Sequence, residues 1–153
     1  MQQQKQTPQQ AFTKIKQYCV YQERCHSEVK ERLFGYGLLK VEVEEMVSKL
    51  IEENYLNEER FAIHFAGGKF RIKQWGKVKI KHELKQKWVS DYCIKKAVSL
   101  IDSAAYSKTL YKLADLKLNS LKSEKNIFIK KKKLQDHLLM KGFPNLSHLI
   151  RVN

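Results

Sequence analysis

Residues 76–101 read GKVKIKHELKQKWVSDYCIKKAVSLI, and the spacing of their apolar residues decides the fold. Apolar side chains that recur every three or four positions lie on one face of an α-helix and form a stripe that a core can bury. Ser90 and Asp91 are good helix N-caps, because a short side chain with an oxygen can accept hydrogen bonds from the free N–H groups of a first turn. Two helices are therefore predicted, over residues 76–87 and 90–103.

The same pattern of apolar positions occurs three times in the chain. A shift of 51 residues back carries Ile80 onto Val29, and a shift of 54 residues forward carries Ile80 onto Leu134. A regular spacing of this length indicates a repeat protein, whose copies share equivalent core positions. The predicted core positions are Val29, Leu33 and Leu38 in the first copy, Ile80, Leu84 and Val89 in the second, and Leu134, Leu138 and Phe143 in the third.

Each copy has a turn between its second and third helices. The turns lie at Gly37-Leu38, Trp88-Val89 and Gly142-Phe143. Glycine is expected directly after a helix, because it adopts a positive φ without strain. Trp88 departs from this expectation in the second copy.

The repeat predicts an all-α chain of three tandem three-helix units in an elongated, curved array. The units span residues 8–56, 57–105 and 106–153, after a disordered N-terminus of residues 1–7. The predicted helices span residues 8–23, 25–36, 40–54, 57–74, 76–87, 90–103, 107–123 and 126–140, with a short last helix over 145–152. One such unit cannot bury its apolar stripes alone, so neighbouring units have to stack. Gly67-Gly68 is expected to weaken or kink the helix that contains it.

The formal net charge of +14 is spread unevenly along the chain. Residues 40–60 hold seven acidic and three basic residues, a net charge of −4. Residues 61–90 hold eight basic residues and one acidic residue, a net charge of +7, and residues 105–153 hold eleven basic and three acidic residues, a net charge of +8. A surface this basic favours a polyanion as partner. The candidate residues facing DNA, or a filament on DNA, are Lys69, Arg71, Lys73, Lys77, Lys79, Lys81, Lys130 and Lys133, with Phe70 and Trp75 among them.

Two of these lysines hold equivalent positions in the repeat. Lys79 precedes core residue Ile80, and Lys133 precedes core residue Leu134. They are therefore the better candidates for a contact made twice along the array. The run 130–133 is four lysines, whose side chains differ in direction by about 100° from one to the next, so part of the run is only solvated.

The acidic stretch has two interpretations. Glu58 and Glu59 follow Asn57, a predicted N-cap, and carboxylates in a first helical turn offset the helix dipole. The second interpretation is that the acidic face of residues 40–60 repels DNA and meets a basic protein surface.

No motif indicates an enzyme or a cofactor. The sequence has no Gly-rich phosphate loop, no Gly-x-Ser-x-Gly and no close pair of carboxylates in an apolar pattern. Cys19, Cys25 and Cys93 lack the paired spacing of a zinc site or a disulfide framework, so we expect reduced, mostly buried thiols and no metal. No stretch approaches the roughly 18 apolar residues of a membrane span. The polar start lacks the apolar core of a secretory signal, which favours the cytoplasm.

Five segments of the chain resemble the RecX family, bacterial regulators of the RecA recombinase. They are YCVYQERCH (18–26), EVKERL (28–33), YLNEERFA (55–62), WGKVKIKHEL (75–84) and LLMKGF (138–143). The most specific part is an acidic pair followed by Arg60-Phe61-Ala62, with Gly76, Lys79-Ile80 and Glu83-Leu84 downstream. The chain departs from the family at Asn57, where Asp is frequent, at Trp88, where Gly is common, and in its short third unit.

The resemblance implies tandem three-helix units, each similar to a helix-turn-helix. It also implies binding along a RecA filament on DNA and modulation, usually inhibition, of the recombinase. The first hypothesis is therefore a monomeric regulatory protein whose partners are the filament and its single- or double-stranded DNA. The alternative is a stand-alone nucleic-acid binder that contacts mostly phosphates. An RNA-binding or membrane-surface role ranks third, and an unrecognised enzyme fourth.

Overall fold

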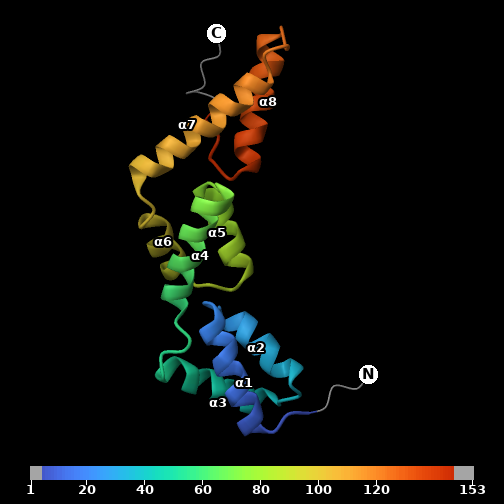
Figure 1. Ribbon diagram of the computed structural model, residues 1–153, viewed down its shortest axis with the longest axis vertical. Coiled ribbons are helices and arrows are strands. Elements are labelled where there is room, and N and C mark those ends of the chain that lie inside the picture. The colour runs from blue at the N-terminus through green and yellow to red at the C-terminus, as the bar shows by residue number, and fades with distance from the viewer. Residues whose placement is uncertain (1–4, 147–153) are drawn as a thin grey trace.

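The computed structural model of the chain describes residues 5–146, and their regular structure is entirely helical (Figure 1). The eight helices of the described residues are α1 (Pro8–Tyr21), α2 (His26–Gly35), α3 (Lys40–Glu52), α4 (Glu58–Lys73), α5 (Lys77–Gln86), α6 (Asp91–Ser99), α7 (Ser103–Ser120) and α8 (Ile127–Met140). Figure 1 shows them in successive groups along one long axis, with α1, α2 and α3 at one end and α7 and α8 at the other. The prediction of an elongated all-α fold of three-helix repeats is confirmed.

Helices α1, α2 and α3 close around a core of their own. Ile15 of α1, Leu33 of α2 and Leu50 of α3 are completely inaccessible to solvent. Thr7 caps α1, because its hydroxyl accepts the Gln10 N–H at 3.2 Å while the Gln10 side chain accepts the Thr7 N–H at 3.1 Å. The apolar stripes of the three helices are buried against one another and against Leu38 and Leu56, and this burial is the main force holding the unit together.

Helices α4, α5 and α6 form the second core, in which Ile80 and Leu84 of α5 are fully buried. Ser90 is the N-cap of α6, and its hydroxyl accepts the Cys93 N–H at 3.4 Å. The Glu58 carboxylate accepts the Ser90 N–H at 3.0 Å. Glu58 therefore fastens the start of α6 to the start of α4, beyond the helix-dipole role predicted for it.

Tyr106 of α7 connects the second core to the third. Its ring centroid lies 5.8 Å from that of Phe70 in α4 and 5.2 Å from that of Phe143 after α8. Its hydroxyl accepts the Lys77 N–H at 3.0 Å. The nine residues predicted as repeat core are all buried, with at most 5% of any of them exposed.

Neighbouring units are joined through the turn that follows a unit's second helix. The Lys87 carbonyl, in the turn after α5, accepts the Ser27 hydroxyl at 2.9 Å. The Lys141 carbonyl, in the turn after α8, accepts the Gly76 N–H at 2.7 Å. In both junctions, the turn of one unit thus rests on the start of the preceding unit's second helix.

Two glycines allow the second junction to close. Gly142 has a φ of +98°, a conformation that other residues rarely adopt. A Cβ on Gly142 would overlap Lys79, and a Cβ on Gly76 would overlap the backbone of Gly142. The two backbones therefore touch with no room for a side chain between them.

The turn of the first unit is covered by the chain's own N-terminal segment. The Gln6 N–H donates to the Tyr36 carbonyl at 2.9 Å, and a Cβ on Gly37 would lie 3.1 Å from Cγ of Lys5. Residues 5–7 of the segment expected to be disordered are thus held against α2, and residues 1–4 lie outside the described part of the chain.

Several helix ends differ from the prediction. Helix α6 ends at Ser99 rather than 103, because the Asp102 carboxylate accepts the Ala105 N–H at 2.8 Å and starts α7 instead. Helix α4 continues through Gly67-Gly68 without interruption. Of the predicted helix over residues 145–152, residues 145 and 146 are not helical and the rest lie outside the described residues.

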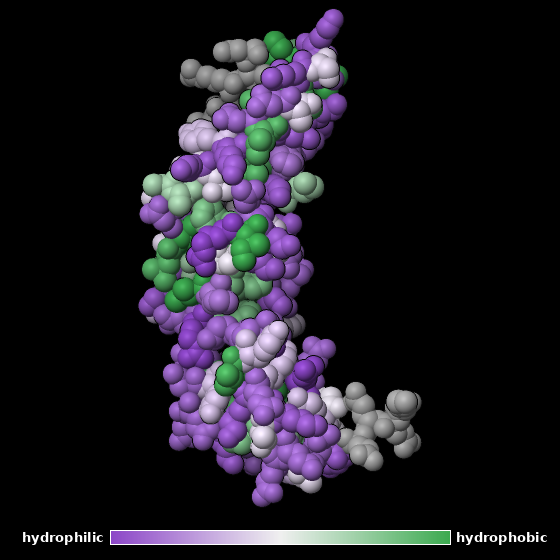
Figure 2. All heavy atoms as spheres, in the orientation of Figure 1, coloured by the Kyte–Doolittle hydropathy of each residue, from purple (hydrophilic) through white to green (hydrophobic). Residues whose placement is uncertain are grey.

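Hydrophilic residues cover most of the face in Figure 2, and apolar residues show between them mainly at mid-length. No helix of the described residues has the length and apolar character that crossing a membrane requires.

Candidate nucleic-acid interface

Lysines of α4 and α5 gather around two aromatic rings. Phe65 and Trp75 meet edge to face, with their centroids 6.5 Å apart. The Lys69 ammonium lies 5.4 Å from the Phe65 centroid and 5.0 Å from the Trp75 centroid, and the Lys79 ammonium lies 4.6 Å from the Trp75 centroid. Rings attract cations at these distances, so the lysines are held in place while their charge remains available to an anion.

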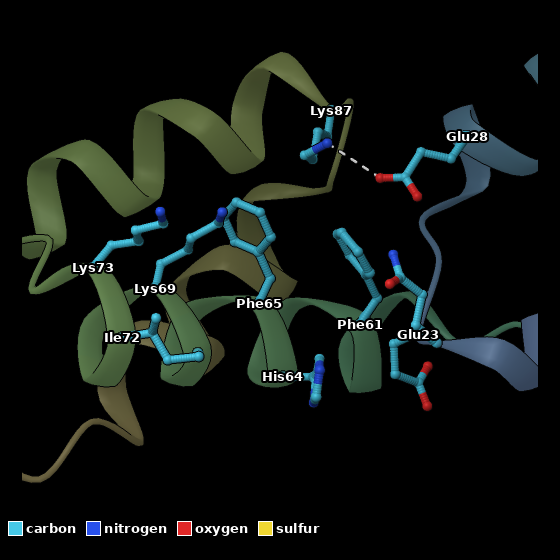
Figure 3. Close-up of a pocket in the computed structure, with 11 residues that line it drawn as sticks. Glu23, Glu28, Phe61, His64, Phe65, Lys69, Ile72, Lys73 and Lys87 are labelled. Carbon is cyan, nitrogen blue, oxygen red and sulfur yellow. Dashed lines mark hydrogen bonds and ion pairs between the residues drawn. The ribbon is translucent and has the colours of Figure 1, made fainter.

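A groove of about 470 Å³ runs beside these rings, between α4 and the connection from α1 to α2 (Figure 3). Phe61 and Phe65 lie in it, and Lys69 and Lys73 rise from α4 toward α5 on the same side. Lys87 borders the groove at the turn after α5, 5.8 Å from the Phe65 centroid. The aromatic–lysine face is our name for the group Phe65, Lys69, Lys73, Trp75, Lys79 and Lys87.

The groove has one end with ion-paired carboxylates and one end with unpaired lysines. Lys87 pairs with Glu28 at 3.1 Å, and Glu23, on the connection from α1 to α2, pairs with Arg60 at 2.6 Å. Within residues 5–146, neither Lys69 nor Lys73 has a carboxylate at ion-pair distance. The basic end therefore carries uncompensated positive charge next to apolar rings, the combination that suits a nucleic-acid strand.

Arg71, Lys77 and Lys81 do not share this face. Arg71 lies in a hollow with Ile63, toward α6, and its guanidinium packs against Gly67. The Lys77 ammonium lies 5.0 Å from the Tyr106 centroid at the junction with α7. Lys81 lines a separate groove between α5 and α6.

The lysines of α8 are distant in sequence and differ in surroundings. Lys133 lies 3.9 Å from the Glu124 carboxylate, whereas its repeat equivalent Lys79 lies over Trp75. Lys130 lies near the start of α8 and has no carboxylate at ion-pair distance among residues 5–146. The structure thus brings Lys69, Lys73 and Lys79 together and leaves the other predicted cations apart.

One of the two aromatic residues that interleave with the cations in the sequence is buried. Phe70 is only 8% exposed and packs on Tyr106. Phe65, not Phe70, lies on the aromatic–lysine face. The signal for it was present, because Phe65, Lys69 and Lys73 are spaced four residues apart and so share one helical face.

The cysteines are buried thiols. Cys19, Cys25 and Cys93 are all free and buried, and burial raises the pKa of Cys19 to about 11 and also raises that of Cys25. The thiols of Cys19 and Cys25 therefore stay protonated at neutral pH, which makes these two cysteines poor nucleophiles and poor metal ligands. Within the described part of the chain, no three His, Cys, Asp or Glu residues gather in a way that could hold a metal ion.

Known proteins resemble this chain in both sequence and fold. Regulatory protein RecX of Prosthecochloris aestuarii is 30% identical over 126 residues, which cover 82% of this chain and 80% of that protein. The chain belongs to the RecX family. Residues 57–98 match the family description "RecX, second three-helix domain". Regulatory protein RecX of Chlorobium phaeobacteroides is 32% identical over 131 residues, covering 84% of this chain and 82% of that protein.

Other RecX proteins are longer than the matched region. Regulatory protein RecX of Bacillus cytotoxicus is 28% identical over 136 residues, and this chain spans 50% of its length. The crystal structure of RecX from Lactobacillus salivarius has a TM-score of 0.82 at 23% identity, over 92% of this chain and 90% of that one. At that identity the structural match shows the fold alone.

The RecX-like residues at the start of α4 fasten the first unit to the second. The Arg60 guanidinium donates to Glu23 at 2.6 Å, to the Asn54 carbonyl at 3.1 Å and to the Asn54 side chain at 3.2 Å. Asn57 caps α4, because its side chain accepts the Arg60 N–H at 2.9 Å. In this RecX-family chain, the motif around Arg60 therefore builds the junction that shapes one end of the groove.

Proposed function

We propose that this chain binds along a RecA recombinase filament on DNA and lowers the filament's ATP hydrolysis and strand exchange. Family membership supports a regulatory role, and the aromatic–lysine face carries the proposal for nucleic acid. Lysines near phosphates gain affinity by releasing condensed counterions, and exposed ring surface adds stacking and apolar contact.

The elongated array suits a filament as partner. A row of stacked units presents an extended surface that can span neighbouring subunits. A ligand shifts an equilibrium only by its differential affinity for the two states, so inhibition requires contacts that a single free recombinase subunit lacks. We expect the chain to act as a cytoplasmic monomer without a cofactor.

The first experiment measures ATP hydrolysis by the matching RecA recombinase on single-stranded DNA, titrated with this chain at moderate salt. We expect hydrolysis to fall at amounts well below those that coat the DNA. A fall only at saturation of the DNA would instead indicate competition for the strand.

Two double variants, each of which removes two lysine charges, test the aromatic–lysine face. Lys69→Gln with Lys73→Gln removes two charges spaced four residues apart on α4, and the control, Lys108→Gln with Lys112→Gln, removes two charges at the same spacing on exposed positions of α7. For single-stranded DNA, we expect the log–log salt dependence of affinity to fall by about 1.4 in the first variant, at about 0.7 per lost phosphate contact. Equal losses in both variants would mean that net charge, not this face, sets the affinity.

The second candidate function is a stand-alone nucleic-acid binder of helix-turn-helix type. The observation in its favour is the pair α5 and α6, joined by a short turn, with lysines along the groove between them. This candidate takes first place if the chain binds DNA tightly while leaving recombinase activity intact.

A further inference from the structure

Trp88 occupies a position in the repeat that the other two units give to glycine. It lies in the turn between α5 and α6 with a φ of +63°, whereas Gly37 and Gly142 hold the equivalent turns at +85° and +98°. A residue with a bulky side chain is strained in this region of backbone conformation. Replacing glycine by tryptophan here therefore works against the stability of the fold.

The indole does nothing for the fold that offsets this strain. Trp88 is 84% exposed, and within residues 5–146 its side chain has no hydrogen bond, ring contact or cation contact. The junction with the first unit is made by its neighbour Lys87, through Ser27 and Glu28. A strained residue that holds a large apolar side chain in solvent indicates a binding role for that side chain.

The surroundings of Trp88 indicate whether its indole binds an apolar pocket of a protein or a nucleic-acid strand. A shallow groove of about 380 Å³ between α5 and α6 is lined by three lysines: Lys81, Lys85 and Lys95. One carboxylate, Asp91, offsets part of this charge, at 4.0 Å from Lys85. Tyr92, in the first turn of α6, adds a second exposed ring, with 68% of its surface accessible.

An exposed indole beside a lysine-lined groove matches the way proteins hold single strands. Every nucleobase has a flat face that can stack on an aromatic ring, and lysines follow the phosphates. The groove reaches the turn that holds Trp88, because Lys85 and Asp91 line it and the Lys85 carbonyl accepts the Trp88 N–H at 3.0 Å. Within residues 5–146, Lys81 and Lys95 have no carboxylate at ion-pair distance, so an apolar protein segment would leave their charges unpaired, whereas the phosphates of a strand would pair with them.

We propose that Trp88 stacks on an unpaired nucleobase of a nucleic-acid strand whose phosphates lie along Lys81, Lys85 and Lys95. This rests on the proposed function in one respect, because it requires the chain to meet nucleic acid. It adds a base contact, at a groove separate from the aromatic–lysine face.

The test compares a 15-nucleotide oligothymidylate with an abasic phosphodiester strand of the same length and charge. We expect the wild-type chain to bind the thymidylate more tightly than the abasic strand. Trp88→Gly should weaken binding to the thymidylate about tenfold and leave the abasic strand unchanged, since stacking is the interaction removed. Trp88→Phe should keep most of the preference, and the control Tyr111→Ala, an exposed ring on α7, should leave it intact.

The melting temperature separates binding from folding. Trp88→Gly relieves the strained backbone, so it should melt at a higher temperature than the wild-type chain while binding the thymidylate more weakly. The inference is overturned if the wild-type chain shows no preference for the strand with bases, or does not bind it at low salt. It is also overturned if Trp88→Gly binds both strands as the wild-type chain does or loses affinity for both equally.

Recombinase ATP hydrolysis, measured with the same variants, keeps the two proposals apart. If the wild-type chain fails to inhibit but the preference for bases depends on Trp88, the filament proposal fails and this inference stands. If the wild-type chain inhibits and Trp88→Gly keeps its preference for bases, only this inference fails. Loss of inhibition without loss of thymidylate affinity would assign Trp88 to a protein contact and overturn the base contact.

Discussion

At the scale of single residues, His26 stands out because its half-buried ring lies where the first and second units meet. Its Nε2 is buried and lacks a hydrogen-bond partner in the described part of the chain. Burial lowers the pKa of His26 below its usual value of 6.5, Lys30 lowers it further, and the Glu58 carboxylate opposes both. The folded chain therefore favours the neutral ring.

This pKa shift makes stability depend on pH in a definite direction. Below about pH 6.5 the unfolded chain takes up a proton that folded His26 resists, so the free energy of unfolding falls as the pH drops toward the folded pKa. We expect the melting temperature to fall between pH 7 and pH 5, and to fall less in His26→Gln. Burial also lowers the pKa of His137, so some dependence should remain.

The matched control for this prediction is His64→Gln, because His64 is exposed on α4. It should keep the pH dependence of the wild-type chain. Identical dependence in the wild-type chain and in His26→Gln would show that His26 is not the group responsible.

At the scale of elements, Arg60 is the residue that holds the start of α4 against the end of α1. Its guanidinium donates hydrogen bonds to Glu23 and to the Asn54 carbonyl at the same time, and the side chain is only 37% exposed. We expect Arg60→Ala to lower the free energy of unfolding by about 1.5–3 kcal/mol, because it removes charge-assisted hydrogen bonds and leaves partners unsatisfied. Urea denaturation measures this as a lower midpoint.

Two further variants show which contacts of Arg60 matter. Glu23→Gln keeps a hydrogen-bond acceptor and should cost less than Arg60→Ala. Arg60→Lys should recover only part of the loss, because an ammonium group cannot reach several partners in the fixed geometry of a guanidinium. Full recovery by lysine would mean that charge alone makes this junction.

The elements also show what the sequence could and could not predict. Periodic apolar positions such as Ile80 and Leu84 identified the helices, because burial is governed by a spacing that is visible along the chain. The end of α6 was missed because Ile101 continues its stripe, while the Asp102 side chain caps the next helix and ends the run. Whether the apolar stripe extends one helix or the capping side chain starts the next depends on three-dimensional contacts.

The sequence predicted which kinds of residue make up the candidate site, but only partly how they are arranged. The sequence grouped Lys69, Lys73 and Lys79 in one basic region, and in the structure they lie near Phe65 or Trp75. Arg71 is close to these lysines in the sequence, but side chains two residues apart on a helix point about 160° away from each other. The sequence does not show how one unit is oriented relative to another, and it therefore could not show that Lys133 lies apart from the lysines of α4 and α5.

At the scale of the whole molecule, the array depends on each unit's contact with its neighbour, so a junction can fail while the units remain folded. Gly142→Ala places a methyl group against Lys79 at a positive φ. We expect this change to cost about 1–3 kcal/mol and to separate α7 and α8 from the second unit. Limited trypsin digestion should then cleave the lysine-rich α7 and α8 before the rest of the chain.

A second glycine provides the control for this prediction. Gly35 ends α2, and a Cβ there would meet nothing within 4 Å. Gly35→Ala should therefore leave the digestion pattern unchanged and stabilise the chain slightly, by at most about 1 kcal/mol. Early cleavage of α7 and α8 in both variants would show that the close contact of Gly142 does not hold the third unit in place.

The hydrogen bond from Gln6 to Tyr36 makes the two ends of the array different. In the two junctions between units, the equivalent carbonyl joins one unit to the unit before it. In the first unit, the chain's own backbone occupies that carbonyl. Gln6 thus takes at the first turn the place that a preceding unit takes at the other two, as a capping segment does at the end of a repeat array.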